Sequence, residues 1–259
     1  MVGLMRNIFS FEFTKSLGIK EDNTNGKYLV IPDLHGRYSV YKNIEYFIKK
    51  KIEDDRHIIF LGDYMDRGES GRIFRRELED VGSYFVMRDL IKLKKYLLKR
   101  GRRVTFLKGN HEIFFEDYYI KGDHTPYYEF DFFKRSVDAI NFICKRNRFF
   151  MPSFIEFLKD LKPYYLDKKY KYLFVHAGID PEGGNIDKQT KEGVIYWIRS
   201  RFIDSDKKLN YTVVFGHTPF SKPFITRDKI GIDSGIYRRE FANLLIINQD
   251  SVEIKRIDK

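Results

Sequence analysis

Cysteine is nearly absent from this chain of 259 residues, because Cys144 is the only one. A lone cysteine cannot form an intrachain disulfide, and it cannot build a thiolate-rich metal site. Long apolar runs are also missing: no stretch approaches the roughly 20 residues that span a bilayer. Residues 1–10 lack the apolar core and the small-residue cleavage site of a signal peptide. We therefore expect a soluble, cytoplasmic protein without a membrane partner.

Low-complexity linkers and internal repeats are absent as well, so nothing in the composition divides the chain. Apolar residues make up 42% of it, and the 24 Phe and 18 Tyr are ample for a buried core. The candidate ligands described below run from residue 33 to residue 217, and a cut between them would split one site. We predict a single domain over residues 1–259, with helical and aromatic inserts near 69–103 and 113–150.

Acidic residues are outnumbered: 37 Asp and Glu face 48 Lys and Arg, which gives a net charge of +11. Such an excess favours anionic partners, for example a phosphorylated protein, a nucleotide or nucleic acid. A Lys-rich surface that is simply solvated explains the same excess, and we rank that explanation first, because net charge governs solubility and encounter rather than chemistry. A helix is predicted to end near Gly101, and its last turns are rich in Lys and Arg. Positive charge at a helix carboxyl end complements the helix dipole, so these residues need not indicate an anionic partner.

Short β-branched or aromatic runs recur along the chain and are typical of buried strands. Each is followed closely by a side chain that can bind a metal. The runs are 28–31 before Asp33 and His35, 58–61 before Asp63, 104–107 before Asn110 and His111, 172–175 before His176, and 213–215 before His217. In α/β sheets, ligand sites form where strands pass into loops at their carboxyl ends. The pattern predicts one polynuclear metal site and a metal-dependent hydrolase.

The segment between the first two runs has the three-to-four spacing of a helix, with Ser39 as its expected N-cap. A strand, a helix and a second strand make a βαβ unit, so the sheet is expected to begin parallel. After Gly216 the pattern changes to the strands 241–247 and 252–257, with no helix between them. We expect these to be antiparallel strands of a second sheet, which makes an α/β sandwich rather than a doubly wound sheet.

Five motifs stand in order between residues 30 and 220. They are Asp33-Leu34-His35-Gly36, Gly62-Asp63-Tyr64-Met65-Asp66-Arg67-Gly68, Gly109-Asn110-His111-Glu112, His176-Ala177-Gly178 and Gly216-His217-Thr218-Pro219. With them the sequence resembles the calcineurin-like metallophosphoesterases, and among these the phosphoprotein phosphatases, which are serine/threonine protein phosphatases, in their bacterial and phage branch. The resemblance implies a metallophosphatase-type α/β sandwich of two mixed sheets flanked by helices. Pro32 and Ala177 depart from the family's motifs, and the spacing from Asp63 to Asn110 is longer than usual, which leaves the substrate open.

The candidate ligands suit a pair of metal ions. Two divalent ions about 3.5 to 4 Å apart clamp the attacking and leaving oxygens of an in-line phosphoryl displacement, and they lower the pKa of a bound water. Asp33 and His35 would serve the first ion and Asp63 would bridge, while the second ion would take Asn110, His176 and His217. Mixed oxygen and nitrogen ligands suit manganese, with iron or zinc as alternatives. Taken singly, each residue is more often a cap, a turn residue or a packed histidine, but together they favour the metal site.

A general acid is expected beside these ligands. His111 follows Asn110, and the turn can aim its ring at the leaving oxygen. Asp66 stands on the same loop as Asp63 and would orient that ring, a pairing that the resemblance also implies. The alternative for Asp66 is an N-cap of the following helix.

Arginine is the side chain whose planar fork matches phosphate oxygens. Arg67, next to Asp66, is the first candidate. Trp197-Ile198-Arg199 matches a Trp-x-Arg of the bacterial and phage branch, so the resemblance implies that Arg199 is the second. Arg201 is the reserve choice.

Residues 113–150 are unusually aromatic. We interpret them first as a helical segment packed on the core, because aromatic runs are more often core, and second as a wall of the substrate groove. His57 and His124 lack ligand spacing and are interpreted as structural.

The resulting prediction is a hydrolase acting on phosphoric esters, and most specifically a serine/threonine protein phosphatase in which hydroxide held by two metals attacks phosphorus directly. Its substrate would be a phosphorylated protein or peptide. An alternative keeps the chemistry and changes the substrate to a dinucleoside polyphosphate such as diadenosine tetraphosphate, or to the phosphate end of a nucleic acid, which is the less expected of the two. A scaffold that binds phosphoproteins without hydrolysis ranks below these enzymes, because no ligand or acid is missing.

Overall fold

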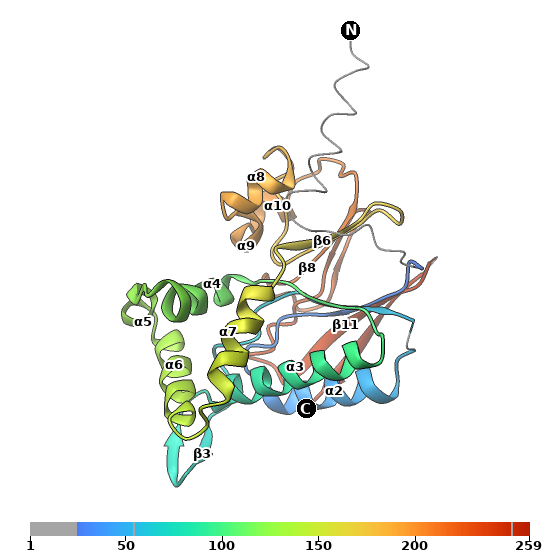
Figure 1. Ribbon diagram of the computed structural model, residues 1–259. Coiled ribbons are helices and arrows are strands. Elements are labelled where there is room, and N and C mark those ends of the chain that lie inside the picture. Colours follow the sequence, from blue (N-terminus) through green and yellow to red (C-terminus); the bar gives the residue numbers. More distant parts are fainter. Residues whose placement is uncertain (1–24, 54, 250) are drawn as a thin grey trace.

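The computed structural model describes residues 25–259 except residues 54 and 250, so the amino-terminal part of the predicted domain, residues 1–24, lies outside the described residues. Two five-stranded sheets pack face to face, and helices cover their outer faces (Figure 1). This arrangement confirms the prediction of an α/β sandwich with two mixed sheets flanked by helices. None of the described helices combines the length and the apolar character that crossing a bilayer requires.

The first sheet has the order β12-β11-β1-β2-β5. Its strands are β1 (Tyr28–Ile31), β2 (His57–Phe60), β5 (Val104–Phe106), β11 (Phe241–Ile247) and β12 (Val252–Asp258). Strands β1, β2 and β5 are parallel, and α2 (Tyr38–Lys50) connects the first two, which confirms the predicted βαβ unit. Strands β11 and β12 are antiparallel to each other, as the sequence predicts.

These two strands nevertheless do not belong to the second sheet, so that part of the prediction is wrong. Strand β11 pairs antiparallel with β1 and extends the first sheet. The physical reason lies in its side chains, which alternate between two apolar cores: Leu244 packs on the helix side and Leu245 between the sheets. A strand that is apolar on both faces needs cover on both faces, and the free edge of β1 offers it.

The second sheet has the order β6-β7-β8-β10-β9. Its strands are β6 (Tyr164–Asp167), β7 (Tyr172–Val175), β8 (Thr212–Phe215), β9 (Phe224–Ile225) and β10 (Lys229–Gly231). Strands β7, β8 and β10 run parallel to one another. Three short helices flank this sheet: α8 (Ile186–Lys191), α9 (Val194–Trp197) and α10 (Ser200–Ile203).

The apolar core is layered, as the alternation along each strand requires. On β1, Leu29 and Ile31 join the core under the helices, while Tyr28 and Val30 join the core between the sheets. A third core lies between the second sheet and α8 to α10. Strands that are buried on both faces read as continuous apolar runs, which is why the sequence locates them well.

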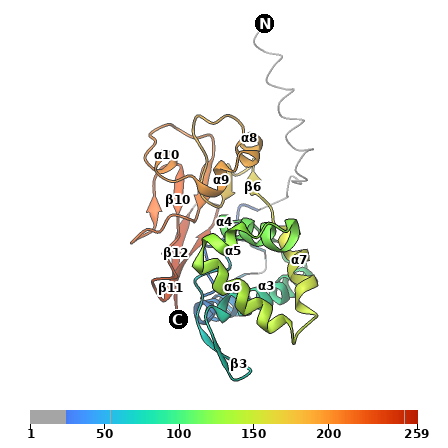
Figure 2. The ribbon, with the colours of Figure 1, turned by 90° about the vertical axis from the view of Figure 1, so that its left-hand side faces the viewer.

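The segment 69–103 is not helical throughout, contrary to the expectation. It begins with a hairpin of β3 (Gly71–Ile73) and β4 (Arg76–Leu78), which projects from the molecule, and only then forms α3 (Val81–Lys99) (Figure 2). The two turn residues between these strands have positive φ, so the turn reverses the chain tightly. Ser39 is also not an N-cap: α2 begins at Tyr38, and the Ser39 amide and hydroxyl donate instead to Glu69.

Helices fill residues 110–160. They are α4 (Asn110–Glu116), the π-helix η1 (Asp117–Lys121), α5 (Thr125–Glu129), α6 (Asp131–Cys144) and α7 (Phe150–Asp160). Helices α6 and α7 both pack on α3. This group therefore stands beside the carboxyl end of β5, where α4 begins, and borders the site described next.

Candidate metal centre

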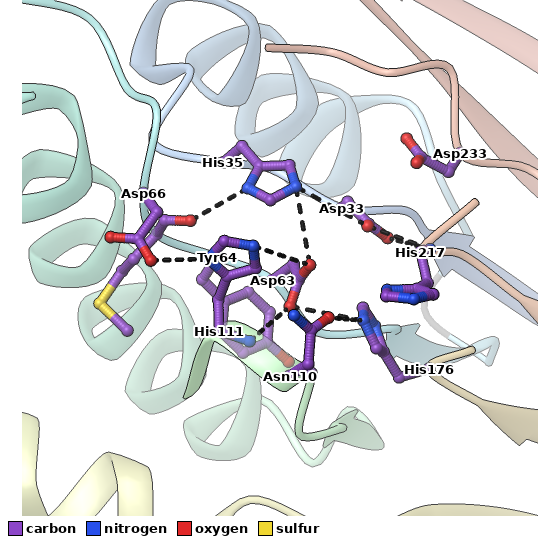
Figure 3. Close-up of polar contacts among 12 residues, drawn as sticks. Asp33, His35, Asp63, Tyr64, Asp66, Asn110, His111, His176, His217 and Asp233 are labelled. Atoms are coloured by element: carbon purple, nitrogen blue, oxygen red, sulfur yellow. Dashed lines mark hydrogen bonds and ion pairs between the residues drawn. The ribbon is translucent and has the colours of Figure 1, made fainter. Parts of the chain in front are cut away.

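The side chains that follow the parallel strands of both sheets meet in one place (Figure 3). Asp33 and His35 follow β1, Asp63 follows β2, Asn110 and His111 begin α4 after β5, His176 follows β7 and His217 follows β8. All of them are buried. The structure thus brings together every residue that the sequence predicts as a metal ligand, from strands far apart along the chain.

Asp63 lies at the middle of the group. Its Oδ2 atom is 3.6 Å from His35 Nε2, and its Oδ1 atom is 3.4 Å from His176 Nε2. Two sets of side chains have possible ligand atoms within 4.8 Å of one another: His35, Asp63 and His111 form one, and Asp63, His176 and His217 form the other. Asp63 belongs to both sets, which is the position that a bridging carboxylate requires.

Asp33 and Asn110 lie next to these two sets. Asp33 Oδ2 is 4.0 Å from His35 Nε2, and both its oxygens accept from the His217 amide at 3.1 to 3.2 Å. Asn110 Oδ1 is 3.0 Å from His176 Nε2. Both side chains therefore present an oxygen to the centre.

Backbone carbonyls decide which nitrogen of two histidines faces the centre. His176 Nδ1 lies 2.8 Å from the Leu61 carbonyl oxygen, and His35 Nδ1 lies 3.2 Å from that of Met65. A carbonyl oxygen can only accept, so each Nδ1 carries the proton and each Nε2 presents a lone pair towards Asp63. This is the tautomer that a metal ligand needs.

The charges of the site fit cations. Burial raises the pKa of Asp33 well above its usual range, and the neighbouring Asp233 and Asp63 raise it further. Burial also raises the pKa of Asp63, and it lowers the pKa of His176 to about 3. Crowded carboxylates and neutral imidazoles together are a donor set that a divalent ion stabilises.

One buried atom adds to this fit. His217 Nε2 is enclosed, and no hydrogen-bond partner reaches it within the part of the chain that the structure describes. An unpaired buried nitrogen costs free energy unless a ligand satisfies it. A metal ion shared with His176 and Asp63 would do so.

Strained backbone holds these side chains in place. Positive φ angles occur at His35 (43°), Asp63 (50°), Asp66 (69°), Arg67 (64°) and His217 (61°). Side chains other than glycine rarely adopt this region, and such strain concentrates at functional sites. Because the chain turns sharply where β1, β2 and β8 end, the polar side chains there point into the centre rather than onward along the strand.

His111 and Asp66 form the predicted pair. His111 Nδ1 lies 2.6 Å from Asp66 Oδ2, and His111 Nε2 lies 3.8 Å from Asp63 Oδ2 (Figure 3). Asp66 is not the cap of the following helix, since Asp80 caps α3 by accepting from the Ser83 amide. Burial raises the pKa of Asp66 to about 8, while a hydrogen bond from Ser136 and the charge of Arg67 lower it.

Two arginines line a pocket of about 210 Å³ over the centre. The Arg67 guanidinium carbon lies 4.7 Å from the ring centroid of Phe132 and 4.9 Å from that of Tyr237. Arg199 donates to the His217 carbonyl at 2.9 Å and to Thr218 Oγ1 at 3.1 Å. Both guanidinium groups are held by protein contacts. The reserve choice, Arg201, instead pairs with Asp180 and is not among the residues that line the pocket.

Aromatic rings make much of the pocket wall. Phe114, Phe130 and Phe132 line one part, and Trp197 and Tyr237 line another. The core interpretation of residues 113–150 holds for buried rings such as Phe115 and Phe133. It is incomplete for the three Phe residues that line the pocket, which is what the second interpretation, a wall of a groove, expects. The sequence pattern cannot separate the two kinds, because both occur within one aromatic run.

Some residues of the site were missed. Glu112 is fully buried and accepts from the Asp63 amide at 2.8 Å and the Tyr64 amide at 2.9 Å, so it holds the Asp63 turn. Asp233 follows β10 and is buried near Asp33. The signal for Asp233 was present: it follows a short buried strand, as the other candidate ligands do.

Manganese is expected to stabilise the metal-free protein against heat. Ions that bind only the folded chain contribute about 2.7 kcal/mol at 100 times their dissociation constant, which corresponds to roughly 5 to 10 °C for a chain of this size. A thermal unfolding series with added manganese measures this shift. The shift should shrink on acidification, because protons compete for the same imidazoles and carboxylates. Equal midpoints with and without saturating manganese would contradict the metal centre.

Comparison with known proteins gives one family match. The family model of the calcineurin-like phosphoesterases matches residues 26–244. No curated protein sequence matches the chain.

Solved structures of similar fold include two phosphatases, one of them putative, and a hypothetical protein. A putative diadenosine tetraphosphatase is 15% identical with a TM-score of 0.57, over 90% of this chain and 95% of its own. A serine/threonine phosphatase from Saccharomyces cerevisiae is 14% identical with a TM-score of 0.52, over 92% of this chain and 81% of its own. A hypothetical protein from Pyrococcus horikoshii OT3 is 14% identical with a TM-score of 0.51, over 90% and 87%. At such identities these likenesses concern the fold alone.

Proposed function

Because the chain belongs to the calcineurin-like phosphoesterase family and is therefore a hydrolase acting on phosphate esters, we propose that its substrates are phosphoserine and phosphothreonine in proteins. One observation carries this proposal: the buried His111–Asp66 pair stands beside Asp63 at the floor of the pocket. Serine and threonine leave as alkoxides, which are strongly basic and need a proton as the bond to phosphorus breaks. A positioned histidine supplies such a proton.

The metal ligands in this proposal are Asp33, His35, Asp63, Asn110, His176 and His217, and manganese is the expected metal. When bound, two divalent ions supply charge neutralisation for the phosphate and lower the pKa of a water molecule for the attack. The fit rests on the shared position of Asp63 and on the buried, unpaired His217 Nε2.

Arg67 and Arg199 would bind and orient the phosphate. The rings of Phe132 and Tyr237 both contact the Arg67 guanidinium, so little side-chain freedom remains to be lost when phosphate binds. Pre-organised positive charge stabilises the transition state more than a mobile side chain would.

His111 would donate its Nε2 proton to the leaving oxygen, while Asp66 holds Nδ1. In the free protein, burial and the charge of Arg67 lower the pKa of His111. A bound phosphate dianion adds negative charge beside the ring and favours its protonated form. Substrate binding therefore favours protonated His111, the form that can donate a proton.

A second candidate function is hydrolysis of a dinucleoside polyphosphate, and the aromatic pocket wall favours it. Trp197 is 48% exposed, and its ring centroid lies 5.8 Å from that of Phe114. Stacking on such rings is worth about 1 to 3 kcal/mol per base. The fold of a putative diadenosine tetraphosphatase is similar to that of this chain over 90% of this chain's length, which is consistent with this candidate.

A substrate panel on the manganese-loaded protein tests the two candidates. We expect turnover of phosphoserine and phosphothreonine peptides to exceed that of diadenosine tetraphosphate. Trp197→Ala should then change peptide turnover little. The ranking of the two candidates reverses if diadenosine tetraphosphate is strongly preferred and Trp197→Ala raises the KM for it by about tenfold or more, as the loss of one stacked base predicts. Failure to release phosphate from the peptides and to cleave diadenosine tetraphosphate into mononucleotides would remove both candidates.

The single-domain prediction remains a proposal. It is supported by the way in which the centre draws residues from strands of both sheets, so that neither sheet holds a complete site alone. A phosphoprotein-binding scaffold without hydrolysis ranks below the enzymes, since each expected ligand and the expected acid are present.

A further inference from the structure

A buried polar cluster continues from Asp66 away from the pocket. It consists of Asp66, Asp80 at the start of α3, Ser83 in α3 and Ser136 in α6. None of these side chains is more than 3% exposed. Helix α6 belongs to the aromatic segment, so the cluster ties that segment to the His111–Asp66 pair.

The Ser136 hydroxyl is the link between two carboxyl groups. Its oxygen is in hydrogen-bond contact with Asp66 Oδ1 and with Asp80 Oδ2, and it lies 3.1 Å from the Phe132 carbonyl oxygen. The other oxygen of Asp80 accepts from the Gly68 amide at 2.9 Å and from the Ser83 hydroxyl at 2.6 Å. The Ser83 oxygen in turn accepts from the Asp66 amide at 2.9 Å.

These contacts require one proton in addition to that of the Ser136 hydroxyl, and two ionised carboxylates have none to give. A serine hydroxyl has one proton, so it can donate to Asp66 or to Asp80 but not to both. If both were ionised, one carboxylate oxygen would face the hydroxyl oxygen at a buried position with no proton between them. A buried unpaired charge of this kind is costly. One carboxyl group must therefore hold a proton and donate it to Ser136.

We propose that Ser136 and Asp80 are positioning residues for the His111–Asp66 pair, and that the two carboxyl groups share one proton through the Ser136 hydroxyl. This inference rests on the proposed function, in which His111 delivers a proton. With the shared proton on Asp80 Oδ2, Asp80 donates to Ser136 and Ser136 donates to Asp66 Oδ1. Asp66 is then ionised, and its Oδ2 accepts from His111 Nδ1–H.

Burial also favours one proton on the Asp66–Asp80 pair. It raises the pKa of Asp66 to about 8 and that of Asp80 to about 7, so the pair keeps a proton near neutral pH. When the His111 ring carries a proton on both nitrogens, its positive charge lies against Asp66. This charge favours an ionised Asp66 and places the shared proton on Asp80.

The same turn of α6 also supports the phosphate arginine. The Ser136 oxygen lies 3.1 Å from the carbonyl oxygen of Phe132, one helical turn earlier, and the Phe132 ring lies against the Arg67 guanidinium. One helical turn thus supports both the acid and a phosphate-binding group, which gives the α6 insertion a role at the site.

Four variants of the manganese-loaded full chain test this role: Ser136→Ala, Asp80→Asn, Asp80→Ala and, as a control, Val137→Ala. Val137 is buried on the same helix but belongs to the apolar core. Each is assayed on a phosphoserine peptide, whose alkoxide needs a proton, and on p-nitrophenyl phosphate, whose leaving group does not. We expect Ser136→Ala to lower kcat on the peptide by about tenfold or more, and to affect p-nitrophenyl phosphate much less.

Asp80→Asn should retain most of the peptide activity, because an amide donates to Ser136 as a protonated carboxyl does, whereas Asp80→Ala should lose it. Val137→Ala should change both substrates alike. The proposal is overturned if Ser136→Ala affects both substrates equally or neither, or if Asp80→Asn loses as much as Asp80→Ala.

Infrared spectroscopy gives a test that needs no activity. The wild-type protein should show the band of a buried protonated carboxyl at neutral pH, and Asp80→Asn should remove it. Absence of the band in the wild type overturns the shared proton. If the protein hydrolyses no phosphate ester while the band is present, the proposed function fails and the shared proton stands.

Discussion

Replacing Asp63 with Asn is expected to lower kcat/KM for a phosphopeptide by about 10³-fold and to reduce the manganese content from two ions per chain. Asp63 is the residue common to both sets of possible ligands, with one oxygen near His35 and the other near His176. An amide has the same shape, but it offers one oxygen and one NH2 group and carries no charge. It cannot bridge two cations, and about 4 kcal/mol of transition-state stabilisation corresponds to the predicted loss.

Steady-state kinetics and elemental analysis of the dialysed protein measure the two effects. Asp138→Asn makes the same chemical change at an exposed carboxylate of α6 and should leave both unchanged. If Asp63→Asn still binds two manganese ions and turns over the peptide like the wild type, Asp63 does not bridge.

The second large effect is expected from His111→Asn, which should lower kcat on a phosphoserine peptide by about 10²- to 10⁴-fold while the manganese content stays the same. The general-acid role predicts this separation, because asparagine cannot deliver a proton to an alkoxide. Turnover of p-nitrophenyl phosphate should fall much less. His124→Asn, at an exposed histidine, is the matched control.

This experiment also decides between two roles that the geometry allows for His111. Its Nε2 atom lies 3.8 Å from Asp63, and with His35 and Asp63 it forms one of the two possible ligand sets. If the variant loses a metal ion together with its activity on both substrates, His111 is a ligand. If the metal stays and only the peptide reaction fails, it is the acid, positioned by Asp66.

Much of the centre could be predicted from sequence because each ligand stands directly after a buried strand. Apolar runs identify the strands, and parallel strands in one sheet must end at the same edge. Asp33 and Asp63 follow from that rule, because β1 and β2 are neighbouring parallel strands of one sheet. His176 follows β7 of the second sheet, so its meeting with them depends on how the two sheets pack. Asp233 also follows a buried strand, the three-residue β10, but it was not among the predicted site residues.

The sheet to which β11 and β12 belong could not be predicted in the same way. Their alternation and their hairpin are local features, and the sequence determined both. The partner of β11 is β1, more than two hundred residues earlier in the chain, and nothing local distinguishes that edge from the edge of the second sheet. The choice depends on which edge leaves both faces of β11 covered.

The sequence by itself therefore determined the class of fold, the strand ends and the chemistry of the ligands, because each of these depends on a few neighbouring residues. Only the tertiary structure decided which rings of the aromatic segment face the pocket, how Arg67 is held between Phe132 and Tyr237, and that Ser136 joins Asp66 to Asp80. Ser136 stands 70 residues from Asp66. Such contacts arise when helices pack, and side-chain packing is set by the whole fold rather than by any segment of it.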